Sequence, residues 1–130
     1  MIERQIDNFS AKAQEKALKI FKKSVIDLTS DIISDTPVDT GRLKNNWFPS
    51  VGAASEQTTE ATANEAGDRA NSFVNNQLAL DKTFYFTNNL PYAFRIEFEG
   101  WSKVKAPQGM VRRNAIRWKQ IVKRAANATN

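Results

Sequence analysis

Apolar residues in the first part of the chain recur at the spacing of an amphipathic helix. They alternate with charged residues from about Glu3 to Ser34, and no Gly or Pro interrupts them before Pro37. This pattern predicts a helix of about eight turns, roughly 45 Å long, with one apolar stripe to bury. The stripe consists of Ile6, Phe9, Ala13, Ala17, Ile20, Phe21, Val25, Leu28 and Ile32. One domain rarely wraps so long a helix, so we expect part of it to lie against another chain. The alternative is an ordinary core helix with one exposed end.

A second helical pattern closes the chain. It runs from Met110 to about Ala126, after the loop-forming residues 107–109. Trp118 lies in the middle of its apolar stripe, and we expect this side chain to anchor the helix. The stripe comprises Val111, Ala115, Trp118, Ile121, Val122 and Ala125.

Between these helices the pattern becomes mixed. Residues 47–52 and 82–87 have the β-branched and aromatic enrichment of strands, and Pro49 indicates an edge strand or a bulge, because proline cannot donate a ladder hydrogen bond. A modest helix is predicted over 68–80. Residues 92–100 fit either period, and we expect a short helical start that becomes extended before Gly100. Residues 53–68 contain no large apolar side chain, which predicts a loop that is mobile or ordered only on assembly.

The segment 36–47 joins the first helix to the first strand, and every residue type in it except Arg42 has a local structural task. Pro37 stops the helix. Asp39 and Thr40 are both competent N-caps, and Gly41 permits backbone angles that other residues resist. Leu43 and Trp47 are expected to be core anchors. Arg42 has no evident structural task there, so it is a candidate partner contact.

These elements predict a single α+β domain over residues 1–130. In it, the long N-terminal helix and the C-terminal helix pack on a small, mostly antiparallel sheet. No run of residues approaches the roughly 20 apolar positions that a membrane span needs, so we expect no membrane association. The N-terminus lacks the layout of a secretory signal.

Composition argues against an enzyme. The chain has no Cys and no His, so it lacks thiolate chemistry, the usual general base and the commonest metal ligand. Glu97 and Glu99 would share one face of a strand and could form an acid–base pair, but a solvated strand face is the favoured interpretation. Asp27, Asp31 and Asp35 recur every four residues. This row favours a polar stripe facing water or a neighbour's basic residues over a cation site. We predict no cofactor and no metal.

The net charge of +5 is concentrated at one end of the chain. After residue 100 there are basic residues and no acidic ones. Such a segment is typical of a solvated helix face, but it also suits contact with nucleic acid or with an acidic protein surface. The candidate contacts are Lys103, Lys105, Arg112, Arg113, Arg117, Lys119, Lys123 and Arg124. Against DNA binding, the same helix has an apolar stripe by which it docks, and no recognised DNA-binding motif accompanies it.

Three segments in order resemble the tail-component family of tailed bacteriophages. The first is Thr-Pro-Val-Asp-Thr-Gly-Arg-Leu at 36–43, followed by Trp47. The second is Asn-Asn-Leu-Pro-Tyr-Ala at 88–93, followed by Glu97, Glu99 and Gly100. The third is the Ala-Pro pair at 106–107, which leads into the last helix. The resemblance covers about residues 5–125.

The resemblance implies a structural virion protein without catalytic activity. Members are α+β domains that assemble as rings at the head–tail interface, commonly hexamers, and supply neck, tail-completion and head–tail joining proteins. The implied partners are copies of the chain, the neighbouring head-closure or connector protein, the tail-terminator or tail-tube protein, and viral DNA in the neck channel. The implied location is the virion neck or tail, after assembly in the cytoplasm of the bacterial host. The alternative function is a small basic DNA-binding protein that uses the C-terminal helix.

Overall fold

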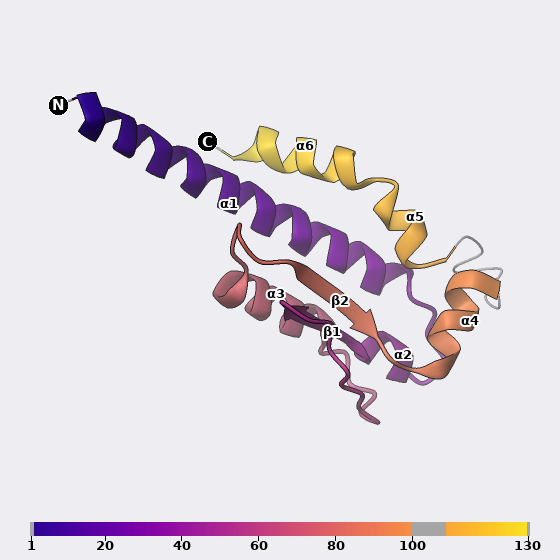
Figure 1. The fold of residues 1–130 in the computed structure, drawn as a ribbon. Coiled ribbons are helices and arrows are strands. Elements are labelled where there is room, and N and C mark those ends of the chain that lie inside the picture. Colours follow the sequence, from indigo (N-terminus) through magenta and orange to yellow (C-terminus); the bar gives the residue numbers. More distant parts are fainter. Residues whose placement is uncertain (1, 100–108, 130) are drawn as a thin grey trace.

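The computed structural model describes residues 2–99 and 109–129, which form six helices and two strands (Figure 1). The fold is α+β, with a long N-terminal helix, a C-terminal helix and a small antiparallel sheet, as the sequence predicts. Along the chain the elements are α1 (Ile2–Asp35), α2 (Arg42–Asn45), β1 (Trp47–Val51), α3 (Ala66–Gln77), β2 (Phe84–Asn88), α4 (Pro91–Glu99), α5 (Val111–Ala115) and α6 (Trp118–Ala128).

The helix α1 has two halves with different surroundings. It has 34 residues, which corresponds to about 51 Å. From Leu18 onward its inward face is covered by the rest of the molecule, and Val25, Ile32 and Ile33 are buried. Residues 2–17 are all exposed and extend beyond the body of the molecule (Figure 1). We call residues 2–17 the free half of α1.

The sheet has two antiparallel strands in the described part of the chain. Trp47 of β1 pairs with Asn88 of β2, and Val51 pairs with Phe84. Pro49 lies opposite Phe86, on a strand whose other edge has no strand partner among the described residues, which agrees with the predicted edge position.

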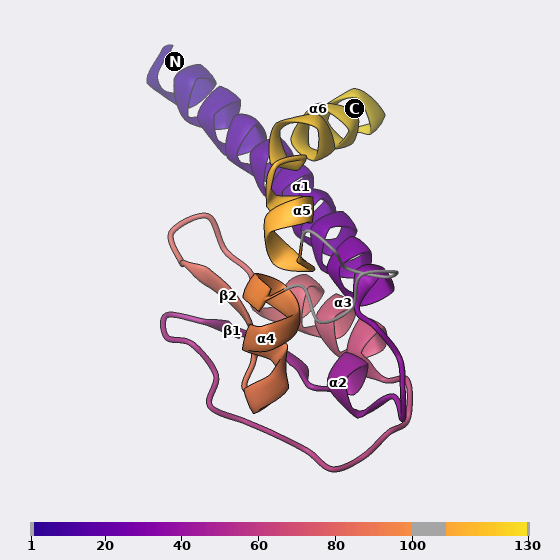
Figure 2. The ribbon, with the colours of Figure 1, turned by 90° about the vertical axis from the view of Figure 1, so that its right-hand side faces the viewer.

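The elements form layers around α1. On one side of α1 lie the sheet and α3, which packs against both β1 and α1. On the other side α5 and α6 run back along α1 (Figures 1 and 2). The C-terminal helix is therefore attached to the body mainly through α1.

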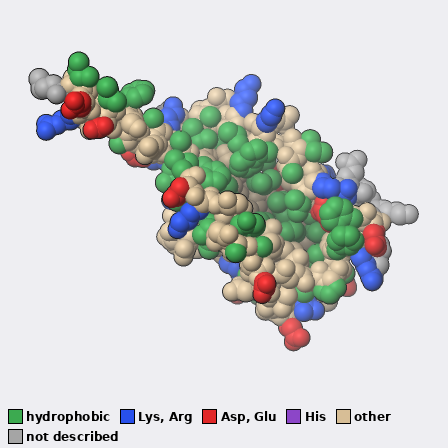
Figure 3. All heavy atoms as spheres, viewed as in Figure 1, with side chains coloured by type: hydrophobic (Ala, Val, Ile, Leu, Met, Phe, Trp, Pro, Cys, Tyr) green, Lys and Arg blue, Asp and Glu red, His purple; other side chains and the backbone are tan. Residues whose placement is uncertain are grey.

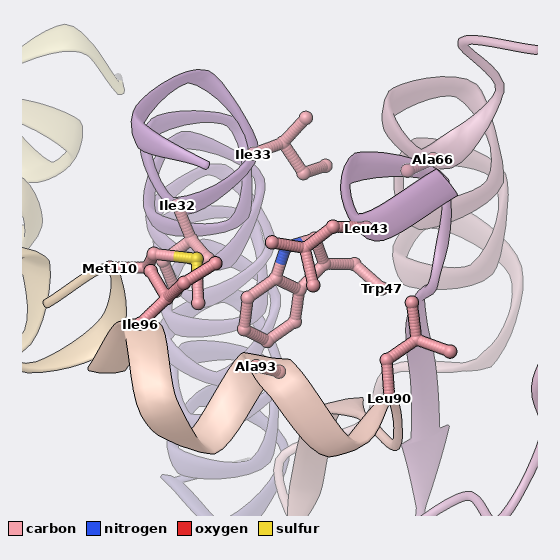
Figure 4. Packing of buried hydrophobic residues seen from close by; sticks show 9 residues of the cluster. All are labelled: Ile32, Ile33, Leu43, Trp47, Ala66, Leu90, Ala93, Ile96 and Met110. Atoms are coloured by element: carbon pink, nitrogen blue, oxygen red, sulfur yellow. The ribbon is translucent and has the colours of Figure 1, made fainter. Parts of the chain in front are cut away.

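Two clusters of apolar side chains form the core. The first lies where the end of α1 meets α2, β1 and α4, and Figure 4 shows its members converging around the Trp47 indole. These members are Ile32, Ile33, Leu43, Trp47, Ala66, Leu90, Ala93, Ile96 and Met110. The second joins Val25 of α1 to Val74 and Leu78, with Trp118 of α6 packed against it.

The predicted change from helix to extended chain within 92–100 is wrong, because α4 is helical up to Glu99. Pro91 occupies the first helical position, where its missing N–H costs nothing. Ala93, Ile96 and Glu97 face inward, at helical spacing. The alternation of Phe94 with Phe98 suggests a strand, but both rings lie on the solvent side of a helix.

The predicted single helix over 110–126 is interrupted. The N–H of Arg117 bonds to the carbonyl of Asn114, only three residues back, and α6 begins anew at Trp118. This turn lets α5 bury Asn114 while α6 buries Ile121 and Ala125. Val111 and Ala115, which the pattern places on the docked stripe, are exposed instead. The helix predicted over 68–80 begins and ends slightly earlier, at Ala66 and Gln77.

Candidate functional site

Segment 36–47 ties the end of α1 to the sheet. The Thr36 hydroxyl is fully buried and donates to the carbonyl of Ile32, at 2.7 Å. It also accepts a 2.9 Å hydrogen bond from the Trp47 indole Nε1. Leu43 and Trp47 are buried in the first core cluster, and the Trp47 ring stacks on Phe86 with centroids 5.1 Å apart. Both residues are the core anchors that the sequence predicts.

The turn before α2 depends on Gly41. Its φ is +92°, and a Cβ there would lie 2.7 Å from the carbonyl oxygen of Thr62. The predicted backbone requirement for glycine is therefore confirmed on two grounds. Thr40 Oγ1 accepts a hydrogen bond from the N–H of Arg42 at 3.2 Å, but the N-cap position of α2 itself is occupied by Gly41. Asp39 is exposed and makes no such bond within the described chain, so its predicted capping role is wrong.

Arg42 has a structural contact that sequence reasoning misses. Its Nε donates to the carbonyl of Thr59, in the loop that follows β1, at 3.2 Å. The residue is half-buried and helps to hold that loop. The prediction that Arg42 lacks a local task is wrong, and its role as a partner contact stays a prediction.

The loop 53–65 contains no helix or strand, but it is fastened to α2. The buried side chain of Asn46 bonds to both the N–H and the carbonyl of Thr59, each at 2.9 Å. Asn45 donates to the carbonyl of Ala61 and accepts from the N–H of Glu65. A polar segment without apolar anchors is thus held through its backbone. The mobility that we predict from its composition stays a prediction.

The basic C-terminal residues do not form one surface. Arg113 lies 3.7 Å from the Asp35 carboxylate at the end of α1. Arg112 pairs with Glu97 through its Nε, at 3.0 Å. These two arginines therefore compensate acidic groups of the same chain. Among the acidic row of α1, Asp27 pairs with Lys23 and Asp35 with Arg113, so these two face basic groups of their own chain.

The other described basic residues of the C-terminal segment lie at the start of α6 and along it. All four of them are exposed, namely Arg117, Lys119, Lys123 and Arg124. A shallow hollow is bordered by Asp31 and by three of these cations, Arg117, Lys123 and Arg124. Lys103 and Lys105 lie outside the described residues. Trp118 is half-buried against the second core cluster, which agrees with its predicted anchoring role. These four residues are the exposed cations of the C-terminal segment that make no ion pair with an acidic side chain in the described part of the chain.

Glu97 is the main residue whose role the sequence does not reveal. The sequence predicts a solvated strand face for it, yet it is 7% exposed. Its Oε1 accepts the N–H groups of Met110 and Val111 at 2.6 and 2.8 Å, and its Oε2 accepts that of Arg112 at 3.0 Å. Arg112 also donates to the Glu97 backbone carbonyl. One carboxylate therefore caps the start of α5 from across the chain. Glu99, by contrast, is exposed as expected.

These contacts determine the charge state of Glu97. Burial by itself would raise the pKa of this carboxyl group. The backbone N–H groups of Val111, Arg112 and Met110, together with the Arg112 guanidinium, stabilise the ionised form more strongly, and the pKa lies below its usual value. One sequence signal for this role is that Met110, at the N-cap position, carries no side chain that can cap, so α5 needs a remote acceptor.

An apolar groove lies between α4 and the start of α5. Its volume is about 420 Å³. Three of its apolar side chains are substantially exposed, namely Phe94 at 61%, Phe98 at 55% and Val111 at 37%. The rings of Phe94 and Phe98 contact each other, with centroids 4.8 Å apart. The groove is lined by Trp47, Asn88, Asn89, Leu90, Pro91, Ala93, Phe94, Glu97, Phe98, Met110, Val111 and Arg112. We call it the α4–α5 groove.

Within 2–99 and 109–129, no three carboxylates come together in a way that could hold a metal ion. The same ranges include no helix that is both long and apolar enough to cross a lipid bilayer. What they do offer is exposed apolar surface and a small basic surface.

The sequence matches no protein-family model, no curated protein and no solved structure.

Proposed function

We propose that this chain is a structural virion protein of a tailed bacteriophage, which forms a ring at the neck, completes the tail and joins it to the head. The observation that carries this proposal is the pair of uncovered apolar surfaces on one chain. The free half of α1 exposes Ile2, Ile6 and Phe9 at 61–76%, and the α4–α5 groove exposes two phenylalanines. Apolar surfaces of this kind typically mark interfaces.

The positions of these surfaces suit a ring of copies. The free half lies at one end of the molecule, and α4 lies at the other end (Figure 1). Figure 3 shows apolar and charged side chains on the arm that projects from the main body. Contacts between two different surfaces of identical chains are heterologous, and they give closed rings when the rotation closes. The resemblance of segments 36–47, 88–100 and 106–112 to the tail-component family supports the same assignment.

The implied neighbours are the head-closure or connector protein on one side and the tail-terminator or tail-tube protein on the other. In this role the exposed cations of α6 contact an acidic neighbouring surface or the DNA in the neck channel. The virion neck is the proposed location.

A small DNA-binding protein is the second candidate. The observation that favours it is the cluster of Arg117, Lys119, Lys123 and Arg124, which is exposed on α6. Such a cluster would neutralise up to about four phosphates and give a binding constant that falls steeply with salt. The loss of Arg112 and Arg113 to intramolecular ion pairs weakens this candidate.

Two measurements on the purified chain separate the candidates. Light scattering after size exclusion, together with electron microscopy at high protein concentration, should reveal closed rings. A DNA-retention assay across a salt series should show weak binding that does not depend on sequence. A chain that stays monomeric at high concentration, also with its head and tail neighbours, and yet binds DNA tightly would contradict the neck-ring function.

A genetic test addresses the joining role directly. In a phage that encodes this chain, a nonsense codon early in the gene should leave DNA-filled heads and completed tails that do not join. Electron microscopy of the lysate would show this. Normal virions from such a mutant would contradict the proposal.

A further inference from the structure

We infer that the free half of α1 of one copy docks in the α4–α5 groove of the next copy. Each contact would then join the convex apolar surface of one chain to the concave apolar surface of the next. This inference rests on the proposed ring, because it specifies the surfaces through which the copies meet.

The free half is poorly suited to remain uncovered in water. Its apolar side chains Ile2, Ile6, Phe9, Ala13 and Ala17 follow helical spacing and form a stripe. The stripe continues the face on which Phe21 and Val25 join the second core cluster. An isolated helix of this length is marginally stable, and helices in proteins gain most of their stability by packing an apolar face.

The groove offers a surface of the opposite shape. Phe94 and Phe98 stand on its α4 side, and Val111 stands on its α5 side. An amphipathic helix placed in an apolar groove is a common recognition mode, in which residues at i, i+3, i+4 and i+7 provide the anchors. Ile2, Ile6 and Phe9 have this spacing.

The two surfaces of one chain cannot reach each other. Ile32 of α1 packs in the same cluster as Ile96 and Met110, beside the groove. Ile6 lies 26 residues earlier on the same uninterrupted helix, which places it about 39 Å away. Each surface therefore needs a second molecule. A contact between two free halves would leave every groove empty, whereas a contact between the free half of one copy and the groove of another covers both surfaces.

Charge is compatible with this arrangement and suggests its orientation. Glu3 and Asp7 are four residues apart and lie on one flank of the apolar stripe, while Lys12 and Lys16 lie on the other. Arg112, whose side chain is 52% exposed, borders the α5 side of the groove. Docking with the acidic flank beside Arg112 would pair opposite charges.

The natural absence of cysteine allows a direct cross-linking test on the full-length chain. Ser10→Cys places a thiol beside the stripe with minimal change, and Val111→Cys places one in the groove. The two variants are mixed and treated with a short bismaleimide. We expect covalent dimers that contain one copy of each variant. Ser72→Cys, on the exposed side of α3, replaces Val111→Cys as the matched control and should cross-link at background level.

A second pair of variants tests the apolar stripe. Ile6→Lys with Phe9→Lys should reduce the cross-linking yield by roughly tenfold, because two charges would enter an apolar groove. Asn8→Lys with Ala11→Lys adds the same charges at the same height on the opposite face, and should leave the yield unchanged. Circular dichroism at the same temperature should show all of these variants folded.

Other outcomes would overturn the inference. These are efficient cross-linking of Ser10→Cys with itself, which indicates paired free halves, or equal yields with the Ser72→Cys control. If electron microscopy shows rings while the cross-link is absent, this contact is wrong and the proposed ring survives. If the cross-link forms but the copies make only open chains, the contact stands and the neck-ring function fails.

Discussion

Single residues hold this fold together at its turns, and Gly41 is the clearest case. We expect Gly41→Ala to lower the free energy of unfolding by about 2 kcal/mol or more. The alanine would have to keep the left-handed backbone angle of the glycine, which side chains disfavour. Its methyl group would also lie 2.7 Å from the Thr62 carbonyl oxygen. Thermal or urea unfolding would measure this loss.

Two other glycines serve as matched controls. Gly52 has a φ of +83°, but no atom lies within 4 Å of the position that a methyl group would take, so Gly52→Ala should cost only about 1 kcal/mol. Gly67 lies within α3 at an ordinary backbone angle with open space, and Gly67→Ala should be neutral or slightly stabilising. Equal losses at all three positions would contradict this explanation.

Glu97 should make stability depend on pH. Its pKa in the folded chain lies below the unfolded value of about 4.3. The ionised carboxylate therefore stabilises the fold fully above that value, and this contribution is lost as the pH falls through the folded-state pKa. We expect Glu97→Gln to lower stability by about 2 kcal/mol at pH 7.

The difference between the wild-type chain and Glu97→Gln should shrink as the pH falls below about 4, because the wild-type carboxyl group then becomes neutral as well. Urea unfolding at several pH values would measure this. Glu99→Gln is the control, because Glu99 is exposed, and its stability should follow that of the wild-type chain. A constant difference between wild type and Glu97→Gln across pH would contradict the assigned role.

At the scale of elements, the loop 53–65 depends on α2. Asn46→Ala removes the side chain that bonds to both backbone groups of Thr59. We expect faster hydrogen exchange and faster proteolysis within 53–65, together with a loss of about 1–3 kcal/mol in stability. Asn71→Ala, on the exposed side of α3, should change neither. Unchanged exchange in the Asn46→Ala variant would mean that the loop is held by other contacts.

The elements also show what sequence patterns can and cannot predict. Periodicity locates α1, because its apolar face repeats over many residues, and β-branched and aromatic enrichment locates both strands. It fails at α4, where Phe94 and Phe98 alternate with polar residues as in a strand but lie on the outside of a helix. It also misses the turn between α5 and α6, because Asn114 is buried there through a 2.8 Å hydrogen bond to Asp35, 79 residues away. The pattern of residues around Asn114 does not indicate a partner so far away in the sequence.

Partners that are distant in sequence also limit the prediction of the candidate contact residues. Segment 36–47 is predicted well at Gly41, Leu43 and Trp47, because turn chemistry and burial act locally there. Two predictions are wrong, namely that Arg42 lacks a local structural task and that Glu97 lies on a solvated strand face, because their partners are the Thr59 carbonyl and the start of α5. A charged side chain without a neighbour in sequence is easily interpreted as solvated or as a contact, whereas the folded chain supplies the partner.

At the scale of the whole molecule, the free half of α1 should be separable from the stability of the body. Removing residues 2–17 takes away no buried side chain, since every residue in this range is exposed. We expect the unfolding free energy of the remaining chain to change by no more than about 0.5 kcal/mol, while self-association is lost. Urea unfolding and light scattering would measure the two effects. A large loss of stability would show that the free half contacts the body.

The continuity of α1 means that the rotational phase of its exposed stripe is fixed by residue count. Inserting one alanine after Ala17 would turn residues 2–17 by about 100° relative to the core, without altering a buried contact. Inserting seven would nearly restore the phase and lengthen the helix by about 10 Å. The length of the helix therefore sets both the direction in which the apolar stripe of the free half faces and its distance from the body. In an assembly built through that end, helix length would set the spacing between copies.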